Sequence, residues 1–155
     1  YARLQLAWTF LLTTEGLPLI YYGDEIGLPG YADPDNRQPM RFEEALTDDE
    51  AATLAHVQRL GQARRDHPAF SVGTRTEWWD NQADLWAYAR VSGSDAVLVA
   101  LNRSETAQSL TNGLAFAGLP DGGYTDVLTG DTFTSDGDSL TFTVPPRGSR
   151  VLVAN

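Results

Sequence analysis

The stretch Leu17-Pro18-Leu19-Ile20-Tyr21-Tyr22-Gly23 decides the fold that we expect for this chain. It is almost continuously apolar up to its closing glycine, which is typical of a short strand buried on both faces, as in a parallel sheet. Pro18 fits such a strand only at its beginning, because proline cannot donate a hydrogen bond to a neighbouring strand. We therefore predict a buried strand over residues 17–22.

A helix is predicted before this strand and a long loop after it. Apolar residues recur at steps of three and four over residues 2–14, and Gly16 follows where the end of a helix favours a positive φ. The loop over residues 23–44 holds three glycines and three prolines among many charged residues. Loops of that length are usually functional. The recurring apolar residues of the helix are Leu4, Leu6, Ala7, Phe10 and Leu11.

A second helix is predicted after the loop. Thr47 and Glu50 have the spacing of a capping box, in which each residue satisfies a free amide of the other. The helix should run over residues 48–65 and end before Pro68, because proline disrupts a helix interior. Its inward face is expected to carry Leu54, Val57 and Leu60.

Beyond Phe70 the periodicity changes from helical to alternating. Residues 83–91 alternate between two faces and are followed by a turn and an apolar strand over residues 96–101. Further short runs follow, separated by turns rich in Gly, Asp and Pro. Such spacing is typical of an antiparallel β-sandwich. The alternating faces are Leu85, Ala87 and Ala89 against Trp86, Tyr88 and Arg90, and the further runs are residues 124–128, 140–144 and 150–153.

Helix, buried strand, long loop and helix follow one another as in one turn of a (β/α)8 barrel, whose active sites lie in the loops after the strands. We therefore predict an α/β plus all-β fold. Residues 1–70 would form the terminal α-β-α portion of a TIM (β/α)8 barrel, and residues 71–155 an antiparallel β-sandwich. Because a full barrel takes about 250 residues, we expect this chain to be cut from a longer parent.

Composition excludes some partners. The chain has 155 residues, of which 42% are hydrophobic, and its net charge of -10 repels phosphate backbones and anionic lipids. We therefore predict neither a nucleic-acid nor a membrane partner. The absence of cysteine excludes disulfides and thiolate metal sites, and leaves the localisation unassigned.

Two strings of residues suggest a family. Residues 16–27 read Gly-Leu-Pro-Leu-Ile-Tyr-Tyr-Gly-Asp-Glu-Ile-Gly, and residues 33–40 read Asp-Pro-Asp-Asn-Arg-Gln-Pro-Met. Together they resemble the segment around the eighth barrel strand of glycoside hydrolase family 13, which holds the α-amylases, cyclomaltodextrinases and neopullulanases. The strings at residues 97–102 and 145–149 resemble the C-terminal domain of that family. The resemblance thus covers nearly the whole chain.

The resemblance implies the C-terminal segment of a retaining glycosidase that hydrolyses α-glucosidic bonds in starch and maltodextrins. Family members carry an aspartate nucleophile, a glutamate acid/base and an Asn-His-Asp stretch in segments absent from this sequence, so we predict no catalytic residue here and no activity of the chain alone. The implied partners are an α-glucan or maltooligosaccharide substrate and the remainder of its own barrel. No cofactor or metal is predicted for this segment, and calcium elsewhere in the parent is unassigned. The rival interpretation is a stand-alone carbohydrate-binding or structural β-sandwich module.

Asp33 and Arg37 are the main candidate substrate-binding residues. Their four-residue separation across a tight loop can bring carboxylate and guanidinium together, and the resemblance implies that this pair contacts a glucosyl unit of the substrate. The alternative is an internal ion pair that only shapes the loop. Adjacent Asp24 and Glu25 point to opposite faces in an extended chain, so a structural role is expected for them.

The remaining candidates are aromatic, basic or acidic. Tyr21 and Tyr22 are expected to pack in the barrel core, and Tyr22 is kept as a further candidate for substrate binding. His56 and His67 lack metal-ligand spacing and are expected at solvated surface positions. Trp86 is expected in the sandwich core, and Trp78-Trp79 is either a sugar-stacking platform or a packing pair. The acidic stretch over residues 131–138 departs from the calcium-loop pattern and is expected to be a solvated turn.

Overall fold

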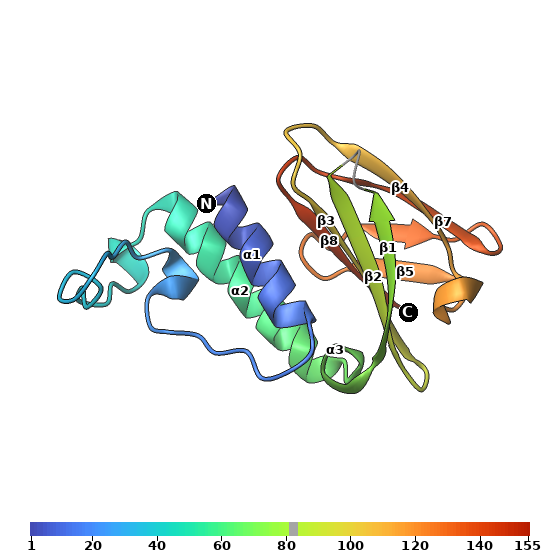
Figure 1. Cartoon of the computed structure of the whole chain (residues 1–155), viewed down its shortest axis with the longest axis horizontal. Coiled ribbons are helices and arrows are strands. Elements are labelled where there is room, and N and C mark those ends of the chain that lie inside the picture. The colour runs from blue at the N-terminus through green and yellow to red at the C-terminus, as the bar shows by residue number, and fades with distance from the viewer. Residues whose placement is uncertain (81–83) are drawn as a thin grey trace.

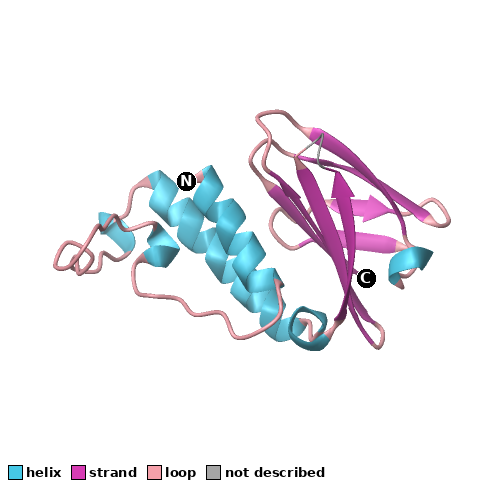
Figure 2. Cartoon of the chain, viewed as in Figure 1, coloured by secondary structure: helices cyan, strands magenta, loops and turns pink. Residues whose placement is uncertain are grey.

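Two long helices pack on one face of a six-stranded antiparallel sheet, and a two-stranded sheet covers its other face (Figures 1 and 2). This computed structural model describes residues 1–80 and 84–155. The helices are α1 (Ala2–Thr13), α2 (Asp48–Asp66) and α3 (Ala69–Val72), with short 3-10 helices η1 (Asp24–Ile26), η2 (Glu43–Ala45) and η3 (Ala115–Ala117). None of the helices in this described part is long and apolar enough to cross a bilayer.

The strands of the larger sheet follow the order β1-β2-β3-β8-β5-β6, and every pair in it is antiparallel. β4 and β7 pair with each other in the smaller sheet. This arrangement agrees with the predicted antiparallel C-terminal domain. The strands are β1 (Thr74–Asp80), β2 (Leu85–Ser92), β3 (Asp95–Asn102), β4 (Gln108–Gly113), β5 (Gly123–Asp126), β6 (Thr132–Thr134), β7 (Ser139–Val144) and β8 (Ser149–Ala154).

β3 shows why the larger sheet tolerates an uninterrupted apolar strand. Successive side chains on a strand point to opposite faces, so Val97 and Val99 pack against the helices, whereas Leu98 and Ala100 pack against the smaller sheet. All four are fully buried. The predicted hairpin of β2 and β3 is confirmed, with its turn at residues 93–94.

The two long helices are confirmed, and so is the capping box that starts α2. The Glu50 amide donates to Thr47 Oγ1 at 3.4 Å, and the Thr47 amide donates to Glu50 Oε2 at 2.9 Å. Val57 and Leu60 are buried as expected, while Leu54 is half-buried. The helix ends at Asp66, two residues before Pro68.

The inward face of α1 differs from the predicted one. Trp8 and Leu12 are buried against α2 and the sheet, whereas Phe10 is 45% exposed and Leu11 36% exposed. Apolar residues occur on more than one side of this helix, so their spacing alone did not select the packed face. The predicted positive φ at Gly16 is confirmed, at 93°.

The predicted buried strand over residues 17–22 is not formed, and this is a correction. The segment belongs to no strand of either sheet. Leu17 is 99% exposed and Leu19 85% exposed. A strand exists only where a neighbour accepts and donates its backbone hydrogen bonds, and no described strand lies beside this segment. The segment nevertheless runs back from the end of α1 toward the start of α2, so the two helices lie parallel (Figure 1).

Helices and sheet share one apolar core. Trp8, Val57 and Leu60 from the helices lie in the same buried cluster as Tyr88 and Val151 from the sheet. The change from helices to strands after α3 therefore does not mark a boundary of this apolar core, which includes residues from both. The division into residues 1–70 and 71–155 stays a prediction.

Candidate functional site

The long loop between η1 and α2 lies at the end of the molecule where both α1 and α2 begin (Figure 1). Residues 28–42 are without regular secondary structure, as predicted, and η1 and η2 bound them. Residues 31–39 are all exposed. We call residues 28–40 the polar loop.

Asp33 and Arg37 meet within the polar loop. Arg37 Nε lies 2.9 Å from Asp33 Oδ1, and both side chains are about two-thirds exposed, at 68% and 64%. Two turns bring them together, because the Asp35 amide donates to the Ala32 carbonyl and the Arg37 amide to the Pro34 carbonyl. The predicted proximity is confirmed, and the role in ligand binding stays a prediction.

The exposed pair is chemically suited to hydroxyl groups. A guanidinium carries five N–H donors in a planar fork, and an ionised carboxylate accepts through two oxygens. The ion pair engages one nitrogen of Arg37 with one oxygen of Asp33. The remaining donors of Arg37 and the other oxygen of Asp33 can therefore bond hydroxyl groups.

Tyr21 and Tyr22 are surface residues, so the expected core packing is wrong. They are 50% and 43% exposed, and their ring centroids lie 4.8 Å apart. The pKa of Tyr22 is raised, first by partial burial and then by the neighbouring Tyr21, while nearby Arg37 lowers it. Tyr22 and Arg37 therefore interact electrostatically.

Asp24 and Glu25 lie in the short 3-10 helix η1. Trp8 Nε1 donates to the Asp24 backbone carbonyl at 3.2 Å, which ties the start of the loop to α1. One carboxylate oxygen of Glu25 is buried without a hydrogen-bond partner among the described residues. For Asp24 the expected structural role is carried by its backbone carbonyl.

The two histidines are not solvated surface residues, which corrects the expectation for both. His56 Nε2 lies 2.9 Å from Thr9 Oγ1, and Thr9 Oγ1 lies 2.9 Å from Ser149 Oγ, so this group joins α2, α1 and β8. His67 Nδ1 lies 2.8 Å from Asp95 Oδ1, which links the end of α2 to the start of β3. Long-range packing, which helical spacing does not reveal, partly buries these rings.

Acidic pH is expected to weaken the fold through His56. Burial lowers the pKa of the His56 imidazole below its ordinary value of 6.5, against a smaller opposing effect of the Gln5 backbone. Between the lowered pKa and 6.5 the unfolded chain binds the proton and the folded chain does not. Stability is therefore complete above that window and falls as the pH drops through it, by at most about 1.4 kcal/mol per pH unit.

The measurement is urea unfolding at several pH values between 7.5 and 5, for wild type and for His56→Gln. Glutamine keeps an amide that can bond Thr9 but does not titrate. The wild type should lose more stability than the variant as the pH falls. Parallel pH profiles for the two proteins would contradict a buried neutral imidazole.

Of Trp78, Trp79 and Trp86, the structure describes only the Trp86 side chain. Trp86 is half-buried and packs against the core between the helices and the sheet, with its ring 4.9 Å from Tyr88 and 5.6 Å from Phe10. It lies on the helix-facing side of β2, opposite the face that meets the smaller sheet. The Trp78 and Trp79 side chains fall outside what the structure describes, so a stacking role for them stays untested.

The acidic stretch over residues 131–138 contains strand β6, so the expected solvated turn is only partly right. Arg150 Nη1 bonds Asp131 Oδ2 at 2.6 Å and also Asp126 Oδ2 at 2.9 Å. The hydrogen bond from Arg150 lowers the pKa of Asp131. Within residues 1–80 and 84–155, no group of three or more His, Asp or Glu side chains is placed to hold a metal ion.

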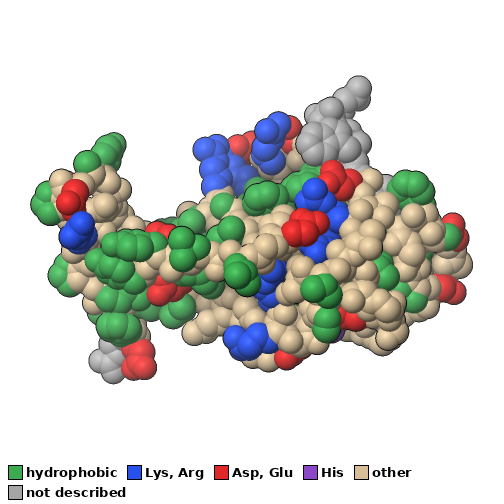
Figure 3. Space-filling model, turned by 60° about the horizontal axis from the view of Figure 1, so that its bottom comes forward, with side chains coloured by type: hydrophobic (Ala, Val, Ile, Leu, Met, Phe, Trp, Pro, Cys, Tyr) green, Lys and Arg blue, Asp and Glu red, His purple; other side chains and the backbone are tan. Residues whose placement is uncertain are grey.

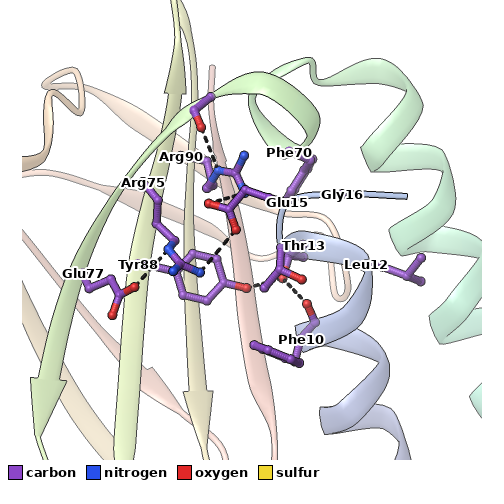
Figure 4. Close-up of polar contacts among 12 residues, drawn as sticks. Phe10, Leu12, Thr13, Glu15, Gly16, Phe70, Arg75, Glu77, Tyr88 and Arg90 are labelled. Carbon is purple, nitrogen blue, oxygen red and sulfur yellow. Dashed lines mark hydrogen bonds and ion pairs between the residues drawn. The ribbon is translucent and has the colours of Figure 1, made fainter. Parts of the chain in front are cut away.

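A polar seam between α1 and the larger sheet was not foreseen (Figure 4). Arg90 on β2 is fully buried, donates through Nε to the Gly73 carbonyl at 3.1 Å, and has Nη1 3.3 Å from Glu15 Oε1. Thr13 bonds the Tyr88 hydroxyl, and burial raises the pKa of Tyr88 to about 12. The only sequence signal was an arginine on the same face of β2 as Trp86 and Tyr88.

Known proteins resemble this chain in both sequence and fold. A family model described as Maltogenic Amylase, C-terminal domain, matches residues 79–151. The curated cyclomaltodextrin glucanotransferase of Geobacillus stearothermophilus is 39% identical over 128 residues, which are 83% of this chain and 17% of that protein. The chain spans about a fifth of the length of the curated relatives that it matches.

Solved structures extend the likeness to the helices. The γ-CGTase of alkalophilic Bacillus clarkii matches with a TM-score of 0.80 and 28% identity over 99% of this chain and 23% of that one. The α-amylase of Geobacillus thermoleovorans, solved with acarbose, matches with a TM-score of 0.81 and 23% identity over 98% of this chain and 33% of its own. The second likeness concerns the fold alone.

Proposed function

Because this chain belongs to the α-amylase family, glycoside hydrolase family 13, and carries its C-terminal domain, we propose that it serves a longer retaining glycosidase that cleaves α-glucosidic bonds in starch and maltodextrins. In this proposal the polar loop forms part of the substrate cleft, and the sheets form the domain on which it rests. The catalytic carboxylates belong to other parts of the parent enzyme. Retaining glycosidases need two of them about 5 to 5.5 Å apart.

The observation that carries the proposal is the exposed ion pair of Asp33 and Arg37, held 2.9 Å apart by the turns of the polar loop. A few fixed polar groups suffice to orient a sugar in a cleft. Tyr22 adds an aromatic face near Arg37. The cyclomaltodextrin glucanotransferase of Geobacillus stearothermophilus, which is 39% identical to this chain over 128 residues, supports an α-glucan as the partner.

Exposed apolar surface supports the remainder of a barrel as the second partner. Large apolar side chains are exposed on α1 and on the segment that follows it, and Figure 3 shows hydrophobic side chains gathered over this half of the molecule. Soluble proteins seldom leave such patches uncovered. Missing barrel strands would cover the patch and give residues 17–22 their hydrogen-bond partners. The exposed residues are Phe10, Leu11, Leu17, Leu19, Ile20, Tyr21 and Tyr22.

Asp33→Ala in the parent enzyme is expected to raise KM for maltooligosaccharides. Losing one or two sugar hydrogen bonds costs about 1 to 2 kcal/mol, which corresponds to a fall in kcat/KM of roughly tenfold. Steady-state kinetics with maltoheptaose measures this effect. Asp35→Ala is the matched control, because Asp35 is an exposed carboxylate of the same loop whose side chain lies outside the ion pair. If both variants match the wild type, Asp33 binds no substrate.

The stand-alone β-sandwich module is a weaker candidate. Such a module would need no helices, yet α1 and α2 supply the buried Trp8, Leu12 and Leu60 to the core that they share with the sheet. It would also leave the apolar segment over residues 17–22 exposed to water. No described feature of the larger sheet favours it over the enzyme fragment.

A further inference from the structure

The polar loop is attached to the rest of the chain at its two ends. At its start, Trp8 Nε1 donates to the Asp24 carbonyl, and Gly27 packs so closely that a Cβ there would lie 2.9 Å from atoms of Leu4 on α1 and of Tyr1 just before it. Gly27 has a φ of 68°, which a residue with a side chain rarely adopts. This end of the loop is therefore held by α1.

The other end is held by α2 through one buried carboxylate. Arg41 donates through Nη1 to Glu50 Oε2 at 3.0 Å and through Nη2 to Glu50 Oε1, and Glu50 is only 4% exposed. A two-pronged contact of this kind restricts orientation as well as distance. The first turn of a helix also favours a negative charge. We call the pair of Arg41 and Glu50 the clamp.

Between these two ends the polar loop bonds mainly to itself. Over residues 29–40, the hydrogen bonds and ion pairs among described residues are the turn bonds of Asp35 and Arg37 and the ion pair of Asp33 and Arg37. The Leu28 amide, just before this range, donates to the nearby Gly23 carbonyl. The place of the ion pair relative to the helices is thus set by the two ends.

We propose that Arg41 and Glu50 are positioning residues, whose clamp fixes the position of the Asp33–Arg37 pair relative to α2 so that the pair meets the saccharide in one orientation. The inference rests on the proposed function, because it concerns the same cleft. The inference assigns Arg41 and Glu50 a role in this cleft, although neither is proposed to contact the substrate. Arg41 lies four positions after Arg37, so little chain separates the clamp from the pair that it holds.

Glu50 also caps α2, and the experiment must separate the two roles. Thr47→Ala removes the hydroxyl of the capping box and leaves both groups of the clamp in place. Arg41→Met removes the clamp and leaves both bonds of the capping box in place. Arg41→Lys keeps the charge but loses the two-pronged contact.

In the parent enzyme, Arg41→Met is expected to raise KM for maltoheptaose roughly fivefold with kcat nearly unchanged, because a displaced contact weakens substrate positioning. Arg41→Lys should fall between Arg41→Met and wild type. Thr47→Ala should lower the unfolding midpoint without changing KM. In an Asp33→Ala background, Arg41→Met should add little, because the contact that it positions is already gone.

Hydrogen exchange gives a second readout that needs no activity. Arg41→Met should speed exchange of the hydrogen-bonded amides of Asp35 and Arg37 and leave exchange in β3 and β8 unchanged. An unchanged KM of Arg41→Met overturns the clamp, as does unchanged exchange or an equal effect of Arg41→Met with and without Asp33. If Asp33→Ala alters kinetics and Arg41→Met does not, only the clamp fails. If neither substitution alters kinetics, the saccharide role of the loop fails with it.

Discussion

Asp126→Ala is expected to lower the free energy of unfolding by about 3 to 5 kcal/mol, because it removes a buried carboxylate that joins β5 to β8. Asp126 is fully buried, and its Oδ1 accepts from the amides of Leu128 at 3.0 Å and Val151 at 3.2 Å. Its Oδ2 accepts from Thr129 Oγ1 and from Arg150 Nη1. Alanine would remove the acceptor of two buried amides and one of the two carboxylates that Arg150 bonds, leaving Asp131 as the other.

Urea unfolding followed by circular dichroism measures this loss. Asp126→Asn is the matched comparison, because the amide keeps one oxygen to accept from Leu128 and Val151 but loses the charge that faces Arg150. The asparagine variant should therefore lie between wild type and the alanine variant. If the free energy of unfolding of the alanine variant lies within about 1 kcal/mol of the wild-type value, these hydrogen bonds do not stabilise the fold as proposed.

Glu15→Ala is expected to lower the free energy of unfolding by about 2 to 3 kcal/mol. This loss is smaller than the usual cost of breaking a fully buried ion pair, because the Glu15 side chain is half exposed. Arg90 is fully buried, and within the described residues its Nη1 and Nη2 make no hydrogen bond of good geometry. Glu15, whose Oε1 lies 3.3 Å from Nη1, is the carboxylate that offsets this charge. Removing it leaves a cation between α1 and the sheet.

The double substitution Glu15→Ala, Arg90→Met supplies the decisive comparison. Replacing both partners of a buried ion pair by apolar groups is often neutral, whereas removing one of them is costly. The double variant should therefore be more stable than Glu15→Ala alone in thermal or urea unfolding. If Arg90→Met adds a further loss on top of Glu15→Ala, the arginine stabilises the seam by packing and not through its charge pair.

Local patterns predicted the two long helices and the hairpin, but not α3 or the short 3-10 helices. The capping box of Thr47 and Glu50 involves residues three positions apart, so its geometry follows from the chain itself. The alternation over β2 and the apolar run of β3 also predicted two adjacent strands with one turn between them. The strands β1, β4 and β6 were missed, because their polar residues show no clear alternation and their pairing depends on distant partners.

The candidate site was predicted only where its contacts join residues close in sequence. Asp33 and Arg37 are four residues apart, and the turns between them suffice to bring their charges together. The clamp of Arg41 and Glu50 was not foreseen, although both residues are close in sequence, because its effect depends on where the loop returns to α2. The histidines were misplaced because their surroundings come from other elements.

The amino-acid sequence by itself determined the helix starts, the alternation of the hairpin and the pairing within the polar loop. Each depends on groups a few residues apart, where backbone geometry limits the alternatives. Only the tertiary structure decided the place of β8 between β3 and β5, the burial of Arg90 beside Glu15 and the exposure of residues 17–22. Hydrogen-bond partners and counter-charges come there from distant parts of the chain, and no local pattern specifies which ones will meet.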